Sequence, residues 1–167
     1  MKKYMPLVLY VWLYAGWFAC VGLGKIDKAA YSLFIPCVGW LIFYSIFSLS
    51  KFEYLKAFIL FLIGICADSV ALNLGLIHFN LKAADYFIPV WMISLWILFI
   101  PTIFILRKPL GNRLWLAALI GSLLGPISYK SGEYFGVLNF DSFAVTFIYS
   151  VFWAIYLPLS IAWVKKT

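Results

Sequence analysis

Six apolar stretches, each long enough to cross a lipid bilayer, constrain the fold of this chain more than any other feature. A transmembrane helix needs about 20 residues to cross roughly 30 Å of hydrocarbon, at a rise of about 1.5 Å per residue. The stretches are joined by short connections, so residues 1–167 predict a single all-α membrane domain with six transmembrane helices. Their predicted bounds are Met5–Leu23, Ala29–Leu49, Leu55–Leu76, Phe87–Leu106, Leu114–Tyr134 and Ser142–Val164.

The composition excludes a soluble domain, because 66% of the 167 residues are hydrophobic and only 11% are charged. A net charge of +7 would favour nucleic-acid binding in a soluble chain. Here the basic residues fall between apolar stretches, where they act as orientation signals. We therefore expect membrane lipids as partners and no nucleic acid.

Lysine and arginine are distributed unevenly between alternate connections. The two tails and the even-numbered connections hold Lys2, Lys3, Lys51, Lys56, Arg107, Lys108, Arg113, Lys165 and Lys166. The odd-numbered connections and the outer end of the fifth stretch hold only Lys25, Lys28, Lys82 and Lys130. The positive-inside rule then predicts that both termini are cytoplasmic. In that orientation most acidic residues lie in the outer half or outside: Asp27, Asp68, Asp85, Glu133 and Asp141.

The fifth stretch is interrupted where a plain transmembrane helix would carry leucines. Residues 121–136 read GSLLGPISYKSGEYFG, with glycines, a proline and two charged residues. Inside a bilayer every backbone N–H and C=O must be satisfied within the protein, so such a segment requires neighbouring helices or a wet cavity. We predict a fifth helix broken at Gly125-Pro126, and a close approach of another helix at the pair Gly121 and Gly125.

Asp68 is a carboxylate about 18 Å along the third stretch, at a depth where insertion costs about 2.5–3.5 kcal/mol. We therefore expect the side chain to face protein or water and to have a partner. Two interpretations stay open. Asp68 is either a hydrogen-bonded clamp to a Ser, Trp or Tyr of a neighbouring helix, or a direct participant in ligand binding or proton handling.

Lys130 and Glu133 are three residues apart, so a helix places them on one face, where they can form an ion pair. Such a pair is either a solvated cap at the outer interface or part of a site. Several unusual residues lie at similar heights in the outer half, which predicts an aromatic-walled pocket with few polar groups, typical of a small-molecule site. The predicted ligand-binding residues are Asp68, Asn73, Trp17, Trp91, Tyr129, Lys130 and Glu133.

Patterns typical of catalytic or metal centres are missing from the sequence. The three cysteines form no CxxC pair, which indicates neither a disulfide framework nor a zinc site, and His78 is the only histidine. Gly-rich phosphate loops, Ser-His-Asp sets and HExxH motifs are not found. We therefore predict no catalytic residue, no metal and no cofactor.

Three blocks of sequence resemble the recurring blocks of one protein family: GWFACVG at 16–22, PVWMISLWILFIPTI at 89–103 and GSLLGPISYKSGEYFG at 121–136. In their order and spacing they resemble an uncharacterised bacterial inner-membrane family, domain of unknown function 2878. The Gly-Pro-x-Ser-Tyr block is the most specific part, and the pair Trp91 and Trp96 comes next. The resemblance implies a multi-pass protein of the bacterial inner membrane. It implies no activity, because the family has none that is settled.

Three functions fit these observations. The favoured one is binding or transport of a lipid or small amphiphilic molecule in the outer aromatic pocket, with Asp68 as its polar anchor. The second is an intramembrane lipid-modifying enzyme with Asp68 and Glu133 as acid and base, which requires the fifth helix to bend inward at Pro126. The third is an accessory subunit that binds a partner membrane protein, or a second copy of the chain, through small-residue faces.

Overall fold

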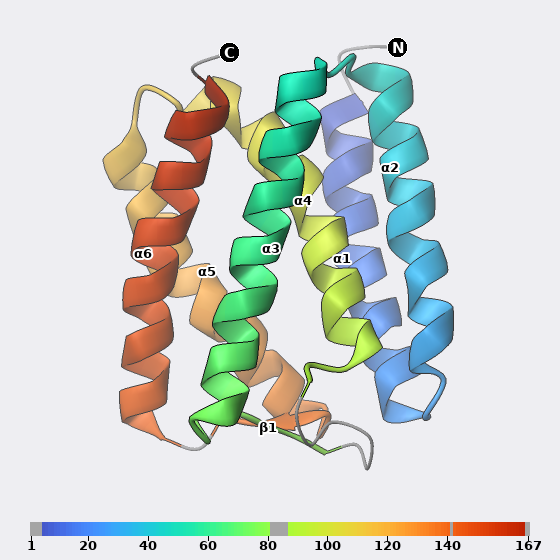
Figure 1. Ribbon diagram of the computed structural model, residues 1–167, viewed down its shortest axis with the longest axis vertical. Helices are drawn as coiled ribbons and strands as arrows, with labels where there is room; N and C mark the ends of the chain where they lie inside the picture. Colours follow the sequence, from blue (N-terminus) through green and yellow to red (C-terminus); the bar gives the residue numbers. More distant parts are fainter. Residues whose placement is uncertain (1–4, 81–86, 141, 166–167) are drawn as a thin grey trace.

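The computed structural model describes residues 5–80, 87–140 and 142–165. Six long helices form one bundle, in which α5 crosses at a slant and the start of α1 lies at the same end as the end of α6 (Figure 1). The elements are α1 Met5–Lys25, the 3-10 helix η1 Ala29–Leu33, α2 Phe34–Ile46, α3 Lys51–Asn73, β1 His78–Phe79, α4 Val90–Leu110, α5 Leu114–Tyr134, β2 Leu138–Asn139 and α6 Phe143–Lys165. Six charged residues used in the sequence argument lie outside the described residues: Lys2, Lys3, Lys82, Asp85, Asp141 and Lys166.

The helices follow the predicted apolar stretches to within a few residues. Four helical segments of the described chain are long and apolar enough to cross a membrane: Ala29–Ile46, Lys51–Asn73, Val90–Leu110 and Phe143–Lys165. The third helix begins earlier than predicted because Ser50 and Glu53 form a capping box. The Ser50 hydroxyl accepts from the Glu53 N–H at 3.3 Å, and the Glu53 carboxylate accepts from the Ser50 N–H at 2.8 Å.

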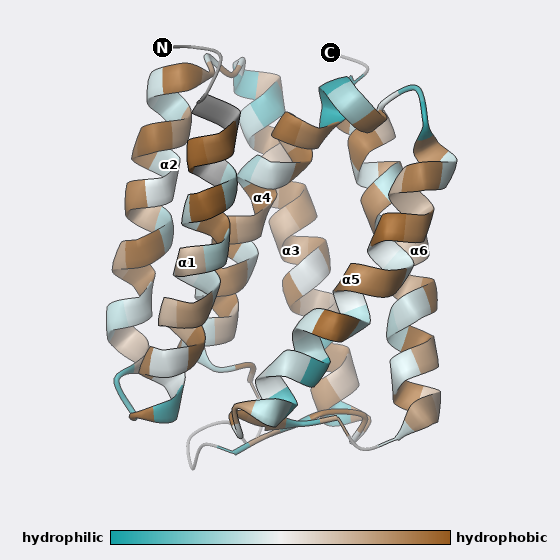
Figure 2. Cartoon of the chain, turned by 180° about the vertical axis from the view of Figure 1, so that it is seen from behind, coloured by the Kyte–Doolittle hydropathy of each residue, from teal (hydrophilic) through white to brown (hydrophobic). Residues whose placement is uncertain are grey.

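Helix α4 lies at the centre of the bundle and packs against α1, α2, α3 and α6. Apolar residues cover the helices along most of their length, while hydrophilic residues gather at the two ends and along the half of α5 that leads to β2 (Figure 2). At one end Arg107, in the last turns of α4, forms an ion pair with Glu53 of α3. Apolar packing around α4 and this polar contact fix α3 beside it.

The predicted break in the fifth helix is wrong. Helix α5 continues from Leu114 to Tyr134 with Pro126 inside it. A proline removes one intrahelical hydrogen bond, but here the neighbouring turn is packed tightly on α6, since a Cβ at Gly121 or Gly125 would clash with Trp153. The close helix approach predicted for these glycines therefore occurs inside the chain, between α5 and α6.

The all-α prediction is confirmed, and a small two-stranded β-sheet that the sequence argument did not predict accompanies the helices. Strands β1 and β2 pair antiparallel, with His78 opposite Asn139 and Phe79 opposite Leu138. They lie at the end of the bundle opposite the start of α1 (Figure 1). The Asn80 amide also donates to the Gly136 carbonyl at 3.1 Å. The sheet thus ties the segment after α3 to the segment after α5.

Candidate functional site

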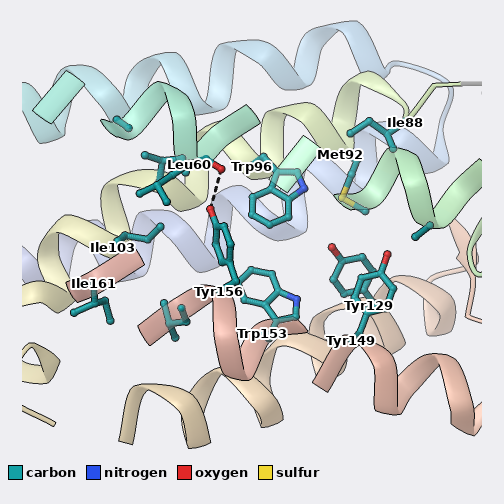
Figure 3. Close-up of a cluster of buried hydrophobic side chains, with 14 of the residues drawn as sticks. Leu60, Ile88, Met92, Trp96, Ile103, Tyr129, Tyr149, Trp153, Tyr156 and Ile161 are labelled. Atoms are coloured by element: carbon teal, nitrogen blue, oxygen red, sulfur yellow. Dashed lines mark hydrogen bonds between the residues drawn. The ribbon is translucent and has the colours of Figure 1, made fainter. Parts of the chain in front are cut away.

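Asp68 of α3 is fully buried and accepts hydrogen bonds from three other helices. Trp96 of α4 donates its indole N–H to Oδ2 at 2.7 Å. Tyr129 of α5 and Tyr149 of α6 donate their hydroxyls to Oδ1 at 2.7 and 3.0 Å. Figure 3 shows these two hydroxyls pointing the same way. We call Asp68 and its three donors the Asp68 cluster, and it joins four helices through one carboxylate.

The geometry of the Asp68 cluster fits an ionised carboxylate. Its three donors in the described chain are uncharged, and the indole of Trp96 can only donate. With Asp68 ionised, each donor meets a lone pair, and the three bonds are of the stronger, charge-assisted kind. A proton on Oδ1 would require Tyr129 or Tyr149 to turn from donor to acceptor. Protonation at Oδ1 would therefore reorient the hydroxyl of one of the two tyrosines.

Aromatic rings surround the Asp68 cluster, and glycines make room for them. The rings of Trp96 and Trp153 are parallel, with centroids 5.5 Å apart. A Cβ on Gly64, one turn before Asp68, would clash with the Trp96 ring, and a Cβ on Gly125 would clash with Trp153. The indole N–H of Trp153 is buried without a hydrogen-bond partner among the described residues. The small residues of α3 and α5 thus set the positions of both tryptophans.

Phe140, just after β2, covers the two tyrosines of the Asp68 cluster. Its buried ring stacks on Tyr129 at 5.6 Å between centroids and meets Tyr149 edge-on at 5.1 Å. The predicted ion pair is confirmed, with Lys130 Nζ and Glu133 Oε2 2.7 Å apart. Lys130 also donates to the Phe140 carbonyl at 2.9 Å, and the Phe140 N–H donates to Glu133 at 3.1 Å. The pair contacts the cover of the cluster, not the carboxylate beneath it.

Three of the predicted ligand-binding residues lie away from the Asp68 cluster. Asn73 is exposed, and its amide donates back to the Ser69 carbonyl at 2.7 Å. Trp17 is half-buried and packs against Phe18, with ring centroids 5.1 Å apart. Trp91 is buried, and its ring meets the Phe79 ring edge-on, with ring centroids 5.7 Å apart. The indole N–H of Trp91 has no hydrogen-bond partner in the described chain. Of the predicted set, only Tyr129 contacts Asp68 directly.

The sequence argument missed Trp96 and Tyr149 as donors to Asp68. Trp96 lies deep in its helix, and a deep tryptophan needs a partner for its indole N–H, which is the signal that points to it. For Tyr149 the signal is its depth in the sixth predicted stretch, which is similar to the depth of Asp68 in the third. Both signals indicate how deep the residue lies in the membrane, and neither indicates whether its side chain faces Asp68.

The arrangement does not favour a two-carboxylate catalytic pair. Asp68 bonds to Trp96, Tyr129 and Tyr149, whereas Glu133 bonds to Lys130 and to the backbone of Phe140. Catalysis by two carboxylates requires both to reach one reacting group. Helix α5 continues through Pro126 without the predicted break, and the Glu133 carboxylate bonds to a different set of groups from the Asp68 carboxylate.

Comparisons with known proteins give one match. No curated protein and no solved structure matches the chain. A family model described as a protein of unknown function, DUF2878, matches residues 6–159. This range contains the whole Asp68 cluster, its Phe140 cover and the three sequence blocks that carry the resemblance. The match covers most of the chain, and the protein therefore belongs to the DUF2878 family.

Proposed function

We propose that the protein spans the bacterial inner membrane six times, with both termini cytoplasmic, and binds or transports a small amphiphilic molecule. The charges of the described residues support this orientation. The end of the bundle where α1 begins carries Lys51, Lys56, Arg107, Lys108, Arg113 and Lys165 (Figure 1). The opposite end carries Lys25, Lys28 and Lys130. An excess of basic residues on one side is typical of the cytoplasmic face.

One observation carries the ligand proposal: a fully buried carboxylate at membrane depth whose three donors in the described chain are uncharged. Intramembrane carboxylates are costly, and they mark ligand or proton pathways more often than they serve packing. Because ionised Asp68 only accepts hydrogen bonds, it selects a headgroup that donates them or is positively charged. The aromatic rings around Asp68 suit the apolar part of such a molecule, and their faces also attract cations.

Access to Asp68 in this proposal is from the outer side, past Phe140. The ion pair that holds the Phe140 backbone is partly exposed, with 44% of the Lys130 side chain and 34% of the Glu133 side chain accessible. Exposed ion pairs contribute only about 0–1 kcal/mol. Displacement of Phe140 would uncover Tyr129 and Tyr149 first, and Asp68 behind them.

Native mass spectrometry of the gently solubilised protein tests the proposal. The wild type should retain a discrete small-molecule mass that Asp68→Asn loses. Asp27→Asn is the matched control, because it replaces a carboxylate by an amide in the same way but far from the Asp68 cluster in sequence. Asp27 lies in a turn with a φ of 58°, a backbone conformation that asparagine tolerates. A mass that survives Asp68→Asn would refute the role of Asp68. No bound mass in any sample would favour the accessory-subunit function, and the next experiment would be a search for a partner.

A further inference from the structure

An apolar groove separates α3 from α6 in the half of the bundle where α3 begins and α6 ends. Its volume is about 530 Å³, within the range of about 300–1,000 Å³ found for small-molecule sites. The groove is lined by Leu60 and Ile63 of α3 and by Phe152, Ile155, Leu159 and Trp163 of α6. It is distinct from the Asp68 cluster, since none of the three residues that donate to Asp68 lines it.

Two long polar side chains cross between α3 and α6 along the groove. The Tyr156 hydroxyl donates to the Leu60 carbonyl at 3.0 Å (Figure 3). Seven residues further along α6, the Trp163 carbonyl accepts from Lys56 Nζ at 2.9 Å, and this ammonium lies 5.7 Å from the Trp163 ring centroid. Carbonyls in the last turn of a helix lack intrahelical partners, which explains why Trp163 accepts this bond. The groove therefore has the Tyr156 hydroxyl bond along its length and a cation, Lys56, beside Trp163 at one end.

We infer that the groove binds one acyl chain of an anionic phospholipid. From Phe152 to Trp163 its lining runs about 16 Å along α6, at about 1.5 Å per residue, close to the roughly 15 Å that one leaflet supplies as half of the hydrocarbon core. Its walls are mainly apolar side chains, and the hydroxyls of its two polar residues, Tyr156 and Ser160, already donate to backbone carbonyls. Such walls match a hydrocarbon chain and offer little to a polar ligand. The length and the lining thus specify the tail of the ligand.

Charge specifies the headgroup. Lys56 lies beside Trp163, at the end of the groove nearest the start of α3, and Lys51 lies at the same end of the bundle. Basic residues near the membrane surface attract anionic headgroups. A phosphate on the bound lipid would lie beside Lys56 while its chain enters between Leu60 and Leu159. Zwitterionic lipids carry the same tail without this net attraction.

The experiment reconstitutes the protein in nanodiscs of equal phosphatidylglycerol and phosphatidylcholine and counts retained lipids by native mass spectrometry. We expect one phosphatidylglycerol per chain. Leu159→Trp should remove it by filling the groove, whereas Ile148→Trp, also on the exposed side of α6 but in the other half, should not. Lys56→Gln should lower the preference for phosphatidylglycerol about fivefold, and Lys51→Gln should lower it less.

Each contrary result is distinct. Equal retention of both lipids, or a phosphatidylglycerol that survives Leu159→Trp, would overturn the inference. A retained free fatty acid in place of the phospholipid would overturn the assigned headgroup. A dimer that Leu159→Trp dissociates would identify a second copy of the chain as the occupant instead. Neither Asp68 nor its three donors line the groove. The lipid count in the wild type and in the Leu159 and Lys56 variants is therefore read separately from the ligand proposal at Asp68, whose failure does not affect these outcomes.

Discussion

Replacing Tyr129 or Tyr149 by phenylalanine removes one hydrogen bond to Asp68 and leaves the aromatic ring in place. A hydrogen bond to a charged group is worth about 1.5–3 kcal/mol, whereas bonds between neutral groups in membrane proteins average about 0.6 kcal/mol. The Tyr129 bond is the shorter, at 2.7 Å against 3.0 Å for Tyr149. We therefore expect free energies of unfolding lower by about 2 kcal/mol for Tyr129→Phe and about 1.5 kcal/mol for Tyr149→Phe.

Tyr156→Phe is the matched control for both variants. Its hydroxyl is also buried and donates at 3.0 Å, but the acceptor is the neutral carbonyl of Leu60. We expect this variant to lose only about 0.6 kcal/mol. Reversible unfolding in mixed micelles of a mild detergent and dodecyl sulfate gives the three free energies under one condition. Equal losses in all three variants would refute the ionised state of Asp68 on which the chemistry of the site depends.

A double-mutant cycle with Asp68→Asn sharpens this result. Trp96 can only donate, so in this variant the oxygen of the introduced amide would face the indole and the amide N–H groups would face the two tyrosines. The tyrosine hydroxyls would then accept weak bonds from a neutral group. In this background Tyr129→Phe should cost no more than Tyr156→Phe does in the wild type. A full loss of about 2 kcal/mol in both backgrounds would show that Tyr129 acts by something other than the carboxylate.

Two further predictions concern the packing of α5 and the cover over the Asp68 cluster. Gly125→Leu should abolish most of the folded yield in a fluorescence size-exclusion assay, because the leucine side chain would clash with Trp153. Gly22→Leu is the control and should keep the wild-type yield, because its side chain enters open space. Equal yields for the two variants would contradict the packing argument. Lys130→Met should cost at most about 1 kcal/mol yet raise hydrogen exchange at the Phe140 amide, and unchanged exchange would mean that the ion pair does not hold this segment.

The length of the apolar stretches was sufficient to predict the helices, because the bilayer requires backbone groups to be satisfied within each spanning segment. The bounds of α3 depend on a local signal that sequence reasoning overlooked, the Ser50 and Glu53 capping box. The break at Pro126 was predicted from intrinsic preference alone. Contacts of Gly121 and Gly125 with α6 overrode that preference, and no local pattern reveals which helix supplies them.

Of the three residues that donate to Asp68, the sequence argument named Tyr129 but neither Trp96 nor Tyr149. The partners expected for Asp68 included Trp and Tyr, and these are what the structure provides. Trp91 and Trp96 are five residues apart, which on an α-helix is about 140° around the axis, so only one of them can face α3. The same angle separates Asn73 from Asp68 and explains why Asn73 is exposed. Depth can be counted along a sequence, whereas the face of a helix is set by packing against its neighbours.

The Asp68 cluster also explains how α3 is attached to α5 and α6. Lipid tails are as apolar as leucine, so hydrophobic burial gives little force between helices, and close packing and polar bonds determine their assembly. Helix α5 meets α6 through glycines, and α3 meets α4 through Gly64 and Trp96. Between α3 and α6 the groove leaves little such packing. The hydrogen bond from Tyr149 to Asp68 therefore holds α3 to α6 where few side chains of the two helices are in contact. A ligand that draws Tyr149 away from Asp68 would weaken the attachment of α3 to α6.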